Sequence, residues 1–158
     1  MLCACIVPPY AEPIEGENHA PVITVPVSWT RKTVNRSASQ PFGKEEFNIE
    51  VRDQDLEQEL SVRVFVNGDY DKVVTIDGGL IHAATNSDGT RLHRVIIAGL
   101  CDTVLDTLGT HLLELYVSDG DFAETTGPEV PPHALRAMVS WRIECEEPPP
   151  PPLGDGGL

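Results

Sequence analysis

Short runs in which apolar and polar residues alternate recur along this chain, and they constrain its fold more than any other feature. Every second residue from Leu60 to Val66 is apolar, and Phe47–Arg52 alternates in the same way. Because side chains along a strand point to opposite faces in turn, such runs predict half-buried β-strands. Turn-forming residues end them, as Asn67-Gly68-Asp69 does after Val66.

The same pattern extends over most of the chain and predicts about seven short strands separated by turn signals. A helical turn is expected between Leu100 and Leu108, with both leucines on its apolar face, and it would cross from one sheet to the other. The segment from Thr30 to Gln40 is expected to be a polar loop. Together these features are typical of an all-β protein, an immunoglobulin-like β-sandwich. The expected strands are Val22–Trp29 (an edge strand broken by Pro26), Phe47–Arg52, Leu60–Val66, Val73–Ile76, Arg91–Ile97, His111–Val117 and Ala137–Ile143.

Both ends of the chain differ in composition from the region between them. Residues 1–20 mix proline with glutamate and have neither helical nor strand periodicity, so they are expected to form a tether. Residues 146–158 contain the five consecutive prolines Pro148 to Pro152, which favour an extended polyproline II tail. The β-sandwich is therefore assigned to residues 21–145, and a length of 158 residues suits one such domain with two disordered or extended tails.

The chain is strongly acidic, with a formal net charge of −14 at pH 7. An acidic chain repels nucleic-acid phosphates, so a nucleic-acid partner is not expected. Attachment to a membrane surface through a polybasic patch is disfavoured for the same reason. No run in the sequence approaches the roughly 20 apolar residues that a membrane-spanning helix needs.

The N-terminus holds the sequence Leu2-Cys3-Ala4-Cys5, in which a small residue precedes a cysteine and a leucine lies three residues before it. This motif resembles the lipobox of bacterial lipoproteins. The resemblance implies cleavage before Cys5 and acylation of its thiol. It therefore implies an exported protein that a lipid anchor holds in the periplasm or at the outer membrane. The alternative is an unordered N-terminus with two incidental cysteines.

Two further segments resemble the cadherin-like and PKD-like domains of bacterial surface proteins. One is Asp53-Gln54-Asp55 with the strand from Leu60 to Val64 that follows it, and the other is Gly109–Gly120. Together with the N-terminal motif, they make the chain similar to immunoglobulin-like lipoproteins of delta-proteobacteria. The resemblance covers residues 20–145 and implies a sandwich domain. It says little about function, because such sandwiches serve many tasks.

Cys101 and Cys145 lie 44 residues apart, one before an expected strand and the other at the end of the last one. Export would expose them to an oxidising compartment, where a disulfide would tie the final strand to the interior. A closed loop of this length stabilises a fold by ~4 kcal/mol in the chain-entropy description. The alternative is a pair of buried free thiols. A zinc site is not expected, since no C-x-x-C spacing occurs.

Four aspartates at the ends of expected strands are candidate calcium ligands, namely Asp53, Asp55, Asp119 and Asp121. The cadherin-like resemblance implies this role, because loop aspartates in such domains bind Ca²⁺ between successive domains. Hard carboxylate oxygens also suit this cation. The alternative is a structural role, because tight turns favour aspartate and glycine for their backbone geometry. No other cofactor is expected.

Catalysis has no recognisable motif in this sequence, which lacks a nucleophile elbow, an H-E-x-x-H pair and a phosphate-binding glycine loop. We therefore expect no enzymatic activity. The expected function is that of a non-catalytic cell-envelope lipoprotein, anchored through its lipid and acting as a structural or interaction subunit among envelope proteins of a larger assembly. The alternative function is that of a calcium-dependent adhesin or a carbohydrate-binding module.

Overall fold

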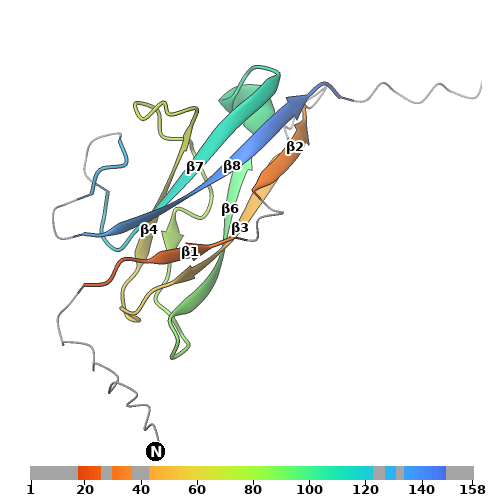
Figure 1. Cartoon of the computed structure of the whole chain (residues 1–158). Coiled ribbons are helices and arrows are strands. Elements are labelled where there is room, and N and C mark those ends of the chain that lie inside the picture. The colour runs from red at the N-terminus through yellow and green to blue at the C-terminus, as the bar shows by residue number, and fades with distance from the viewer. Residues whose placement is uncertain (1–17, 26–29, 37–42, 123–126, 131–133, 149–158) are drawn as a thin grey trace, which may run out of the picture.

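The structure is a computed structural model that describes residues 18–25, 30–36, 43–122, 127–130 and 134–148 (Figure 1). Cys5, Pro26, Trp29 and most of the expected tether and tail lie outside the described residues. Eight strands and one helical turn make up the described part of the chain. Their bounds are β1 (Val22–Thr24), β2 (Arg31–Asn35), β3 (Lys44–Arg52), β4 (Leu60–Val66), β5 (Leu80–Ile81), β6 (Thr90–Ala98), η2 (Leu100–Val104), β7 (Gly109–Ser118) and β8 (Arg136–Glu146).

The strands form two sheets. The smaller sheet has the order β1-β3-β6, and the larger sheet has the order β2-β8-β7-β4-β5. All neighbouring strands are antiparallel except β2, which runs parallel to β8. The chain thus passes repeatedly from one sheet to the other, with β1, β3 and β6 facing β4, β7 and β8. This is the strand arrangement of an immunoglobulin-like sandwich, so the predicted fold is confirmed.

The core lies between the two sheets and follows from the alternation in the sequence. On β3 the side chains of Phe47, Ile49 and Val51 are buried, whereas the residues between them are exposed. Trp141 of β8 enters from the larger sheet and meets the Phe47 ring edge-on, with the ring centroids 5.3 Å apart. Truncation of a buried aromatic side chain costs ~3–5 kcal/mol, so this contact is a principal link between the sheets.

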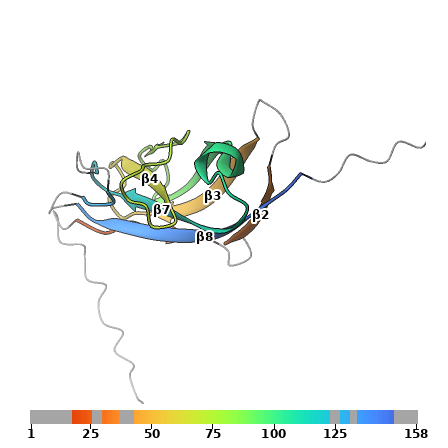
Figure 2. The ribbon, with the colours of Figure 1, turned by 90° about the horizontal axis from the view of Figure 1, so that it is seen from above.

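The predicted helical turn is present and crosses between the sheets, because η2 joins β6 to β7. It is a π-helical turn that follows Gly99, whose φ of 62° lies in the left-handed region that glycine adopts easily. Leu100 and Leu105 are buried, but Leu108 is exposed. The expectation for Leu108 is wrong because the chain has already turned away at Asp106, which has a φ of 49°. The turn lies at the upper end of the sandwich in Figure 1 and faces the viewer in Figure 2.

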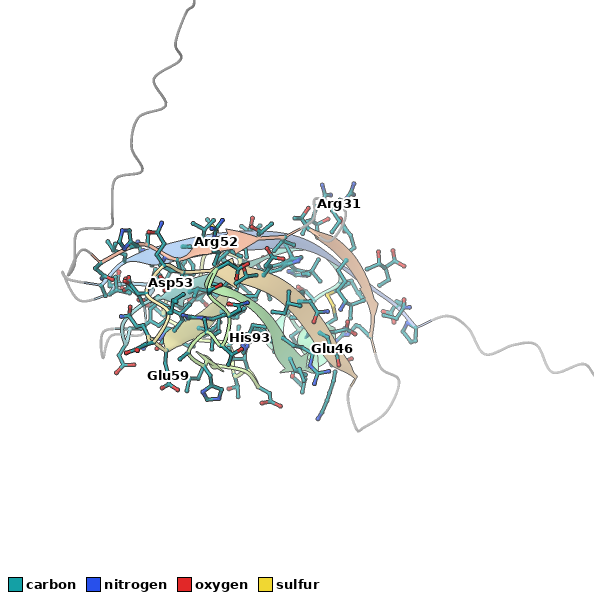
Figure 3. The ribbon with its side chains drawn as sticks, turned by 90° about the horizontal axis from the view of Figure 1, so that it is seen from below. Arg31, Glu46, Arg52, Asp53, Glu59 and His93 are labelled. Atoms are coloured by element: carbon teal, nitrogen blue, oxygen red, sulfur yellow. A yellow bond between two sulfur atoms is a disulfide. The ribbon has the colours of Figure 1, made fainter. Side chains whose placement is uncertain are left out.

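The predicted disulfide joins Cys101 of η2 to Cys145 of β8, with the two Cα atoms 5.6 Å apart. Both residues are buried, and their bond (yellow in Figure 3) ties the crossover between the sheets to the final strand. A disulfide indicates a protein that matures in an oxidising compartment outside the cytoplasm. Among the described residues, no helix is long and apolar enough to cross a membrane.

The segment expected to be a polar loop contains a strand. β2 pairs with β8 over all five of its residues. Only one of its inward residues, Val34, is apolar. The other, Lys32, holds its ammonium 4.9 Å from the centre of the Phe47 ring and 2.7 Å from the Glu45 carboxylate. Because a lysine occupies one of the two inward positions, the sequence of this segment lacks the apolar alternation that would have predicted a strand.

The strand expected at Val73–Ile76 is not formed, and this prediction is wrong because the segment passes from one sheet to the other. The Val74 N–H donates to a carbonyl of β4 in the larger sheet, at Val64. Asp77 exchanges two backbone hydrogen bonds with Ile96 of β6 in the smaller sheet. The short strand that pairs with β4 is β5, further along the chain.

Candidate binding surfaces

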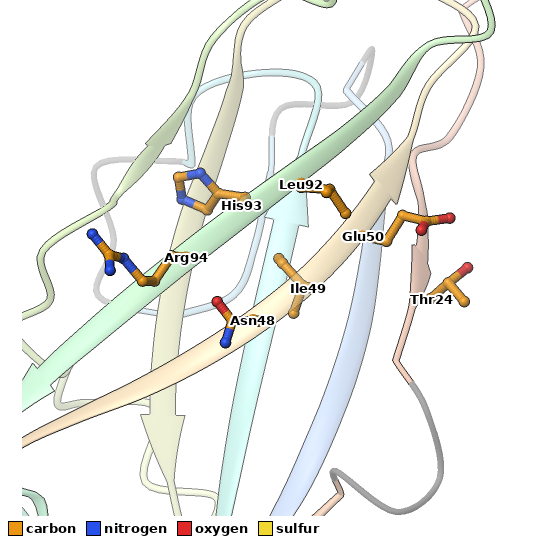
Figure 4. Close-up of a pocket in the computed structure, with 7 residues that line it drawn as sticks. All are labelled: Thr24, Asn48, Ile49, Glu50, Leu92, His93 and Arg94. Carbon is orange, nitrogen blue, oxygen red and sulfur yellow. The ribbon is translucent and has the colours of Figure 1, made fainter.

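The outer face of the smaller sheet is hollowed between its three strands (Figure 4). The hollow has a volume of about 380 Å³. It lies on the face of the smaller sheet that is exposed to solvent, away from the core. Seven residues of β1, β3 and β6 line it, namely Thr24, Asn48, Ile49, Glu50, Leu92, His93 and Arg94. We refer to it as the Leu92 hollow.

The register of the three strands explains how the Leu92 hollow is built. Thr24 pairs with Glu50, which pairs with Leu92 on its other side, so their side chains form one row across the sheet. Asn48 and Arg94 form the next row. Residues directly opposite each other in a sheet share a face, so both rows point outward. The short side chains of Thr24 and Asn48 leave a space beside the longer ones.

Leu92 is the most exposed large apolar side chain in the described part of the chain, with 84% of its surface accessible. Full burial of a leucine side chain is worth about 1.5–3 kcal/mol. A partner that covered Leu92 would therefore gain a substantial part of its binding free energy. Glu50 lies beside Leu92 in the same row, and Arg94 in the next row pairs with Glu46 at 3.3 Å. The hollow thus combines an apolar wall with charges of both signs.

The Leu92 hollow also adjoins a strand edge, because β6 is the last strand of the smaller sheet. Ile96 donates to Asp77 and accepts from it on the side away from β3. Alternate residues of a strand direct their N–H and C=O groups to the same side. The backbone groups of Leu92, four residues before Ile96, therefore point away from β3 as well. Such an edge can pair with an extended segment of another chain.

The structure brings all four predicted calcium ligands to one end of the sandwich, where three of them lie close to one another. Asp53 follows β3 and Asp119 follows β7, and they are 1% and 3% exposed. Asp55 lies beside Asp53, whose Oδ1 accepts a hydrogen bond from the Asp55 N–H at 3.0 Å. Figure 3 labels Asp53. The fourth residue, Asp121, is exposed and accepts a hydrogen bond from the Ser61 hydroxyl at 3.2 Å.

A buried arginine, Arg91, brings positive charge to the same end of the sandwich. Its Nη2 donates to the backbone carbonyl oxygens of Asp55 and Leu56 at 3.1 and 3.3 Å. Burial raises the pKa of the Asp53 carboxyl above its ordinary value, and the carboxylates of Asp55 and Asp119 raise it further. The hydrogen bond from Asp55 and the charge of Arg91 oppose this rise without cancelling it.

Only part of this arrangement suits a cation. The Oδ2 atoms of Asp53 and Asp119 are buried and have no hydrogen-bond partner in the part of the chain that the structure describes, and carboxylate oxygens are the ligands that calcium prefers. However, Asp119 Oδ1 already accepts from the Leu135 N–H at 2.6 Å, and the Arg91 guanidinium would repel a cation. Within the described residues, no three His, Cys, Asp or Glu side chains are grouped as metal ligands. Calcium binding stays a prediction.

A second surface, which the sequence did not indicate, lies on the outer face of the larger sheet. Phe65, Tyr116 and Phe122 form a small buried cluster there, and Val130 of the β7–β8 loop packs against it. Alternation does not show which residues of β7 face outward, because Leu112 to Val117 is apolar at almost every position. Glu114, the acidic residue within that run, is the available signal.

Two described histidines have structural partners. The ring of His111, on β7, bonds through Nδ1 to Asn67 at 3.1 Å and through Nε2 to the Thr107 carbonyl at 3.0 Å. His93 bonds through Nε2 to the Gly78 carbonyl at 2.8 Å. Both rings therefore serve to join segments of the fold. The Leu92 hollow and the adjoining edge of β6 offer apolar contact, ion pairing and backbone hydrogen bonding, which are interactions through which proteins bind other proteins.

Comparison with known proteins adds no family to this description. No protein-family model matches the chain, and a search of curated proteins found no match.

The raised pKa of Asp53 makes a prediction about the pH dependence of stability. The folded protein binds a proton more tightly at this carboxyl than the unfolded chain does. Ionised Asp53 therefore lowers the free energy of unfolding as the pH rises above about 3.8, the ordinary pKa that this carboxyl has in the unfolded chain. Asp53→Asn mimics the protonated form. Urea unfolding of both proteins from about pH 3 to pH 7 should show stability shifting in favour of the variant as the pH rises. A difference that stays constant, or that grows in favour of the wild type, would contradict the assignment.

Proposed function

We propose that this chain is a non-catalytic structural or interaction subunit of a larger cell-envelope assembly, and that it docks through the Leu92 hollow. One observation carries the proposal, namely a leucine with 84% of its surface exposed beside a hollow of about 380 Å³. Contact between apolar surfaces is the main driving force of protein association. The proposed occupant is a segment of a partner protein in the envelope.

The chemistry of the hollow defines this partner more closely. Its segment runs alongside β6 in an extended conformation at Leu92, next to the part of this edge that Asp77 and Gly78 cover. An apolar side chain of the segment fills the hollow against Leu92. Glu50 follows Asn48 by two positions on β3, and Arg94 lies opposite Asn48 on β6, so a partner with one basic and one acidic group at matching positions gains specificity.

The proposed location follows from the cysteines. The disulfide between Cys101 and Cys145 supports export to an oxidising compartment. The lipobox-like motif supports acylation at Cys5, which would hold the domain in the periplasm or at the outer membrane. Membrane attachment through one end of the chain leaves the faces of the sandwich available to partners.

A second candidate function, that of a calcium-dependent adhesin or carbohydrate-binding module, is favoured by one observation. The buried Oδ2 atoms of Asp53 and Asp119 have no hydrogen-bond partner among the described residues, and both lie at the same end of the sandwich. A cation bound there would satisfy them. This candidate ranks second because Arg91 already brings positive charge to that end.

Substitution of Leu92 tests the first proposal. Burial of a leucine is worth about 1.5–3 kcal/mol, so Leu92→Asn should weaken partner binding about tenfold to a hundredfold. The measurement is the amount of partner that co-purifies with the protein from gently solubilised envelopes of its native host. The matched control is Thr33→Asn, at an exposed position on β2 of the other sheet. Recovery of the wild-type protein as a lone monomer, or an equal yield of partner with Leu92→Asn, would overturn the proposal.

Calcium removal tests the second candidate. A cation that binds only the folded state stabilises it by mass action. The adhesin hypothesis therefore expects a higher melting temperature in millimolar CaCl₂ than in EDTA, and a smaller shift after Asp119→Asn. Equal melting temperatures in the two solutions would remove this candidate without affecting the first.

A further inference from the structure

Glu114 is a buried acidic residue on the outer face of the larger sheet, and one of its carboxylate oxygens lacks a hydrogen-bond donor among the described residues. It lies on β7, opposite Phe65 of β4 on one side and Ser140 of β8 on the other. The residue is only 6% exposed. Its Oε1 accepts a hydrogen bond from the Tyr70 hydroxyl at 3.2 Å. Its Oε2 is buried and has no hydrogen-bond partner among the described residues.

An acceptor of this kind is costly, because a buried carboxylate oxygen without a donor loses its hydration and gains nothing in return. The arginines near Glu114 on β4 and β8 are directed elsewhere, and one of them, Arg142, pairs with the Glu144 carboxylate at 2.8 Å. Arg63 donates to the Gly127 carbonyl at 2.8 Å and lies over the Phe122 ring. Arg136 donates to the Pro128 carbonyl and lies over the Tyr116 ring. Both thus help to hold the β7–β8 loop on the sheet.

Apolar side chains exposed to solvent surround Glu114. Tyr70 is 38% exposed, Leu112 is 43% exposed and Met138 is 51% exposed. Leu112 precedes Glu114 by two positions on β7, and Met138 precedes Ser140 by two positions on β8. All of them therefore lie on the same face as Glu114. We call these residues, together with Ser140, the Glu114 patch.

We propose that the Glu114 patch binds a partner protein through an arginine side chain that projects from an apolar surface. The guanidinium donates to Oε2 of Glu114 and stacks on the ring of Tyr70, while neighbouring apolar groups cover Leu112 and Met138. Arginine suits this position because its planar cation both pairs with carboxylates and stacks on aromatic rings. Met138 can adapt its shape to the incoming side chain, since its own unbranched side chain is flexible.

Charge complementarity supports a basic occupant over a second copy of this chain. The net charge of −14 disfavours self-association and attracts cationic partners. Asp71 follows Tyr70 on its loop and adds negative potential at the rim of the patch, whereas Asp69 is paired with Lys72 at 3.7 Å. The patch lies on the opposite sheet from the Leu92 hollow, so its occupancy does not depend on the proposed function. A subunit with both surfaces could join two neighbours.

The methyl group of Met138 reports on the patch directly, because the chain has only one other methionine, Met1. The protein, with its Cys101–Cys145 disulfide intact and its methionine methyl groups labelled with ¹³C, is titrated with the peptide acetyl-Leu-Arg-Leu-amide. The control peptide replaces arginine with citrulline, which has nearly the same shape and no charge. We expect a saturable shift of the Met138 signal with the arginine peptide, and binding weaker by about tenfold or more with the citrulline peptide.

Variants separate the patch from other acidic surface. Glu114→Gln keeps the shape and removes the charge, so it should weaken arginine-peptide binding about tenfold or more. Ser140→Arg places a guanidinium directly opposite Glu114 and should abolish binding by filling the site from within. Glu59→Gln, at an exposed glutamate outside the patch, should leave binding unchanged. The proposal is overturned if the arginine peptide does not move the Met138 signal, if citrulline binds equally well, or if Ser140→Arg binds like the wild type.

Discussion

The packing of one sheet against the other is the interaction on which the rest of this structure depends. It is concentrated where Phe47 of β3 meets Trp141 of β8, and it fixes which side of each strand is buried. Once Phe47, Ile49 and Val51 point inward, the residues between them must form the outer face of the smaller sheet. The Leu92 hollow is thus a consequence of the core. The disulfide secures the same packing at the end where η2 crosses between the sheets.

Buried polar atoms that lack a hydrogen-bond partner among the described residues mark places where this fold is less stable than it could be. Asp53, Arg91 and Asp119 bring charges to one end of the sandwich, and Glu114 places another under the outer face of the larger sheet. Such groups lower the stability of an isolated domain. Natural proteins accept that loss at functional sites more often than elsewhere. Exposed apolar side chains surround Glu114. A single partner would cover these side chains and also donate the hydrogen bond that Glu114 lacks, which would offset the loss of stability.

Alternation in the sequence was sufficient to predict β3 and β4, because alternate residues of each are apolar and point into the core, whereas β7 was predicted from an almost continuous apolar run. It failed for β2, where Lys32 takes an inward position, and for Val73–Ile76, which crosses between sheets. The disulfide between Cys101 and Cys145 was predictable from their positions only together with the export that the N-terminal motif implies, because the sequence also allowed two buried free thiols. The exposure of Leu92 was not predictable, since Arg91–Ile97 carries apolar residues on both faces and only the register shows which face is inside. On β7 the available signal was Glu114, and the apolar residues around it give no alternation that would show which face it shares.

The central claim is that this sandwich works outside the cytoplasm as an anchored interaction domain. Mass spectrometry without reduction, on the protein isolated from its native host, tests it most directly. The account predicts a peptide in which Cys101 is joined to Cys145, and an N-terminal peptide that begins at an acylated Cys5. An intact Met1 together with four free thiols would contradict both the location and the anchor.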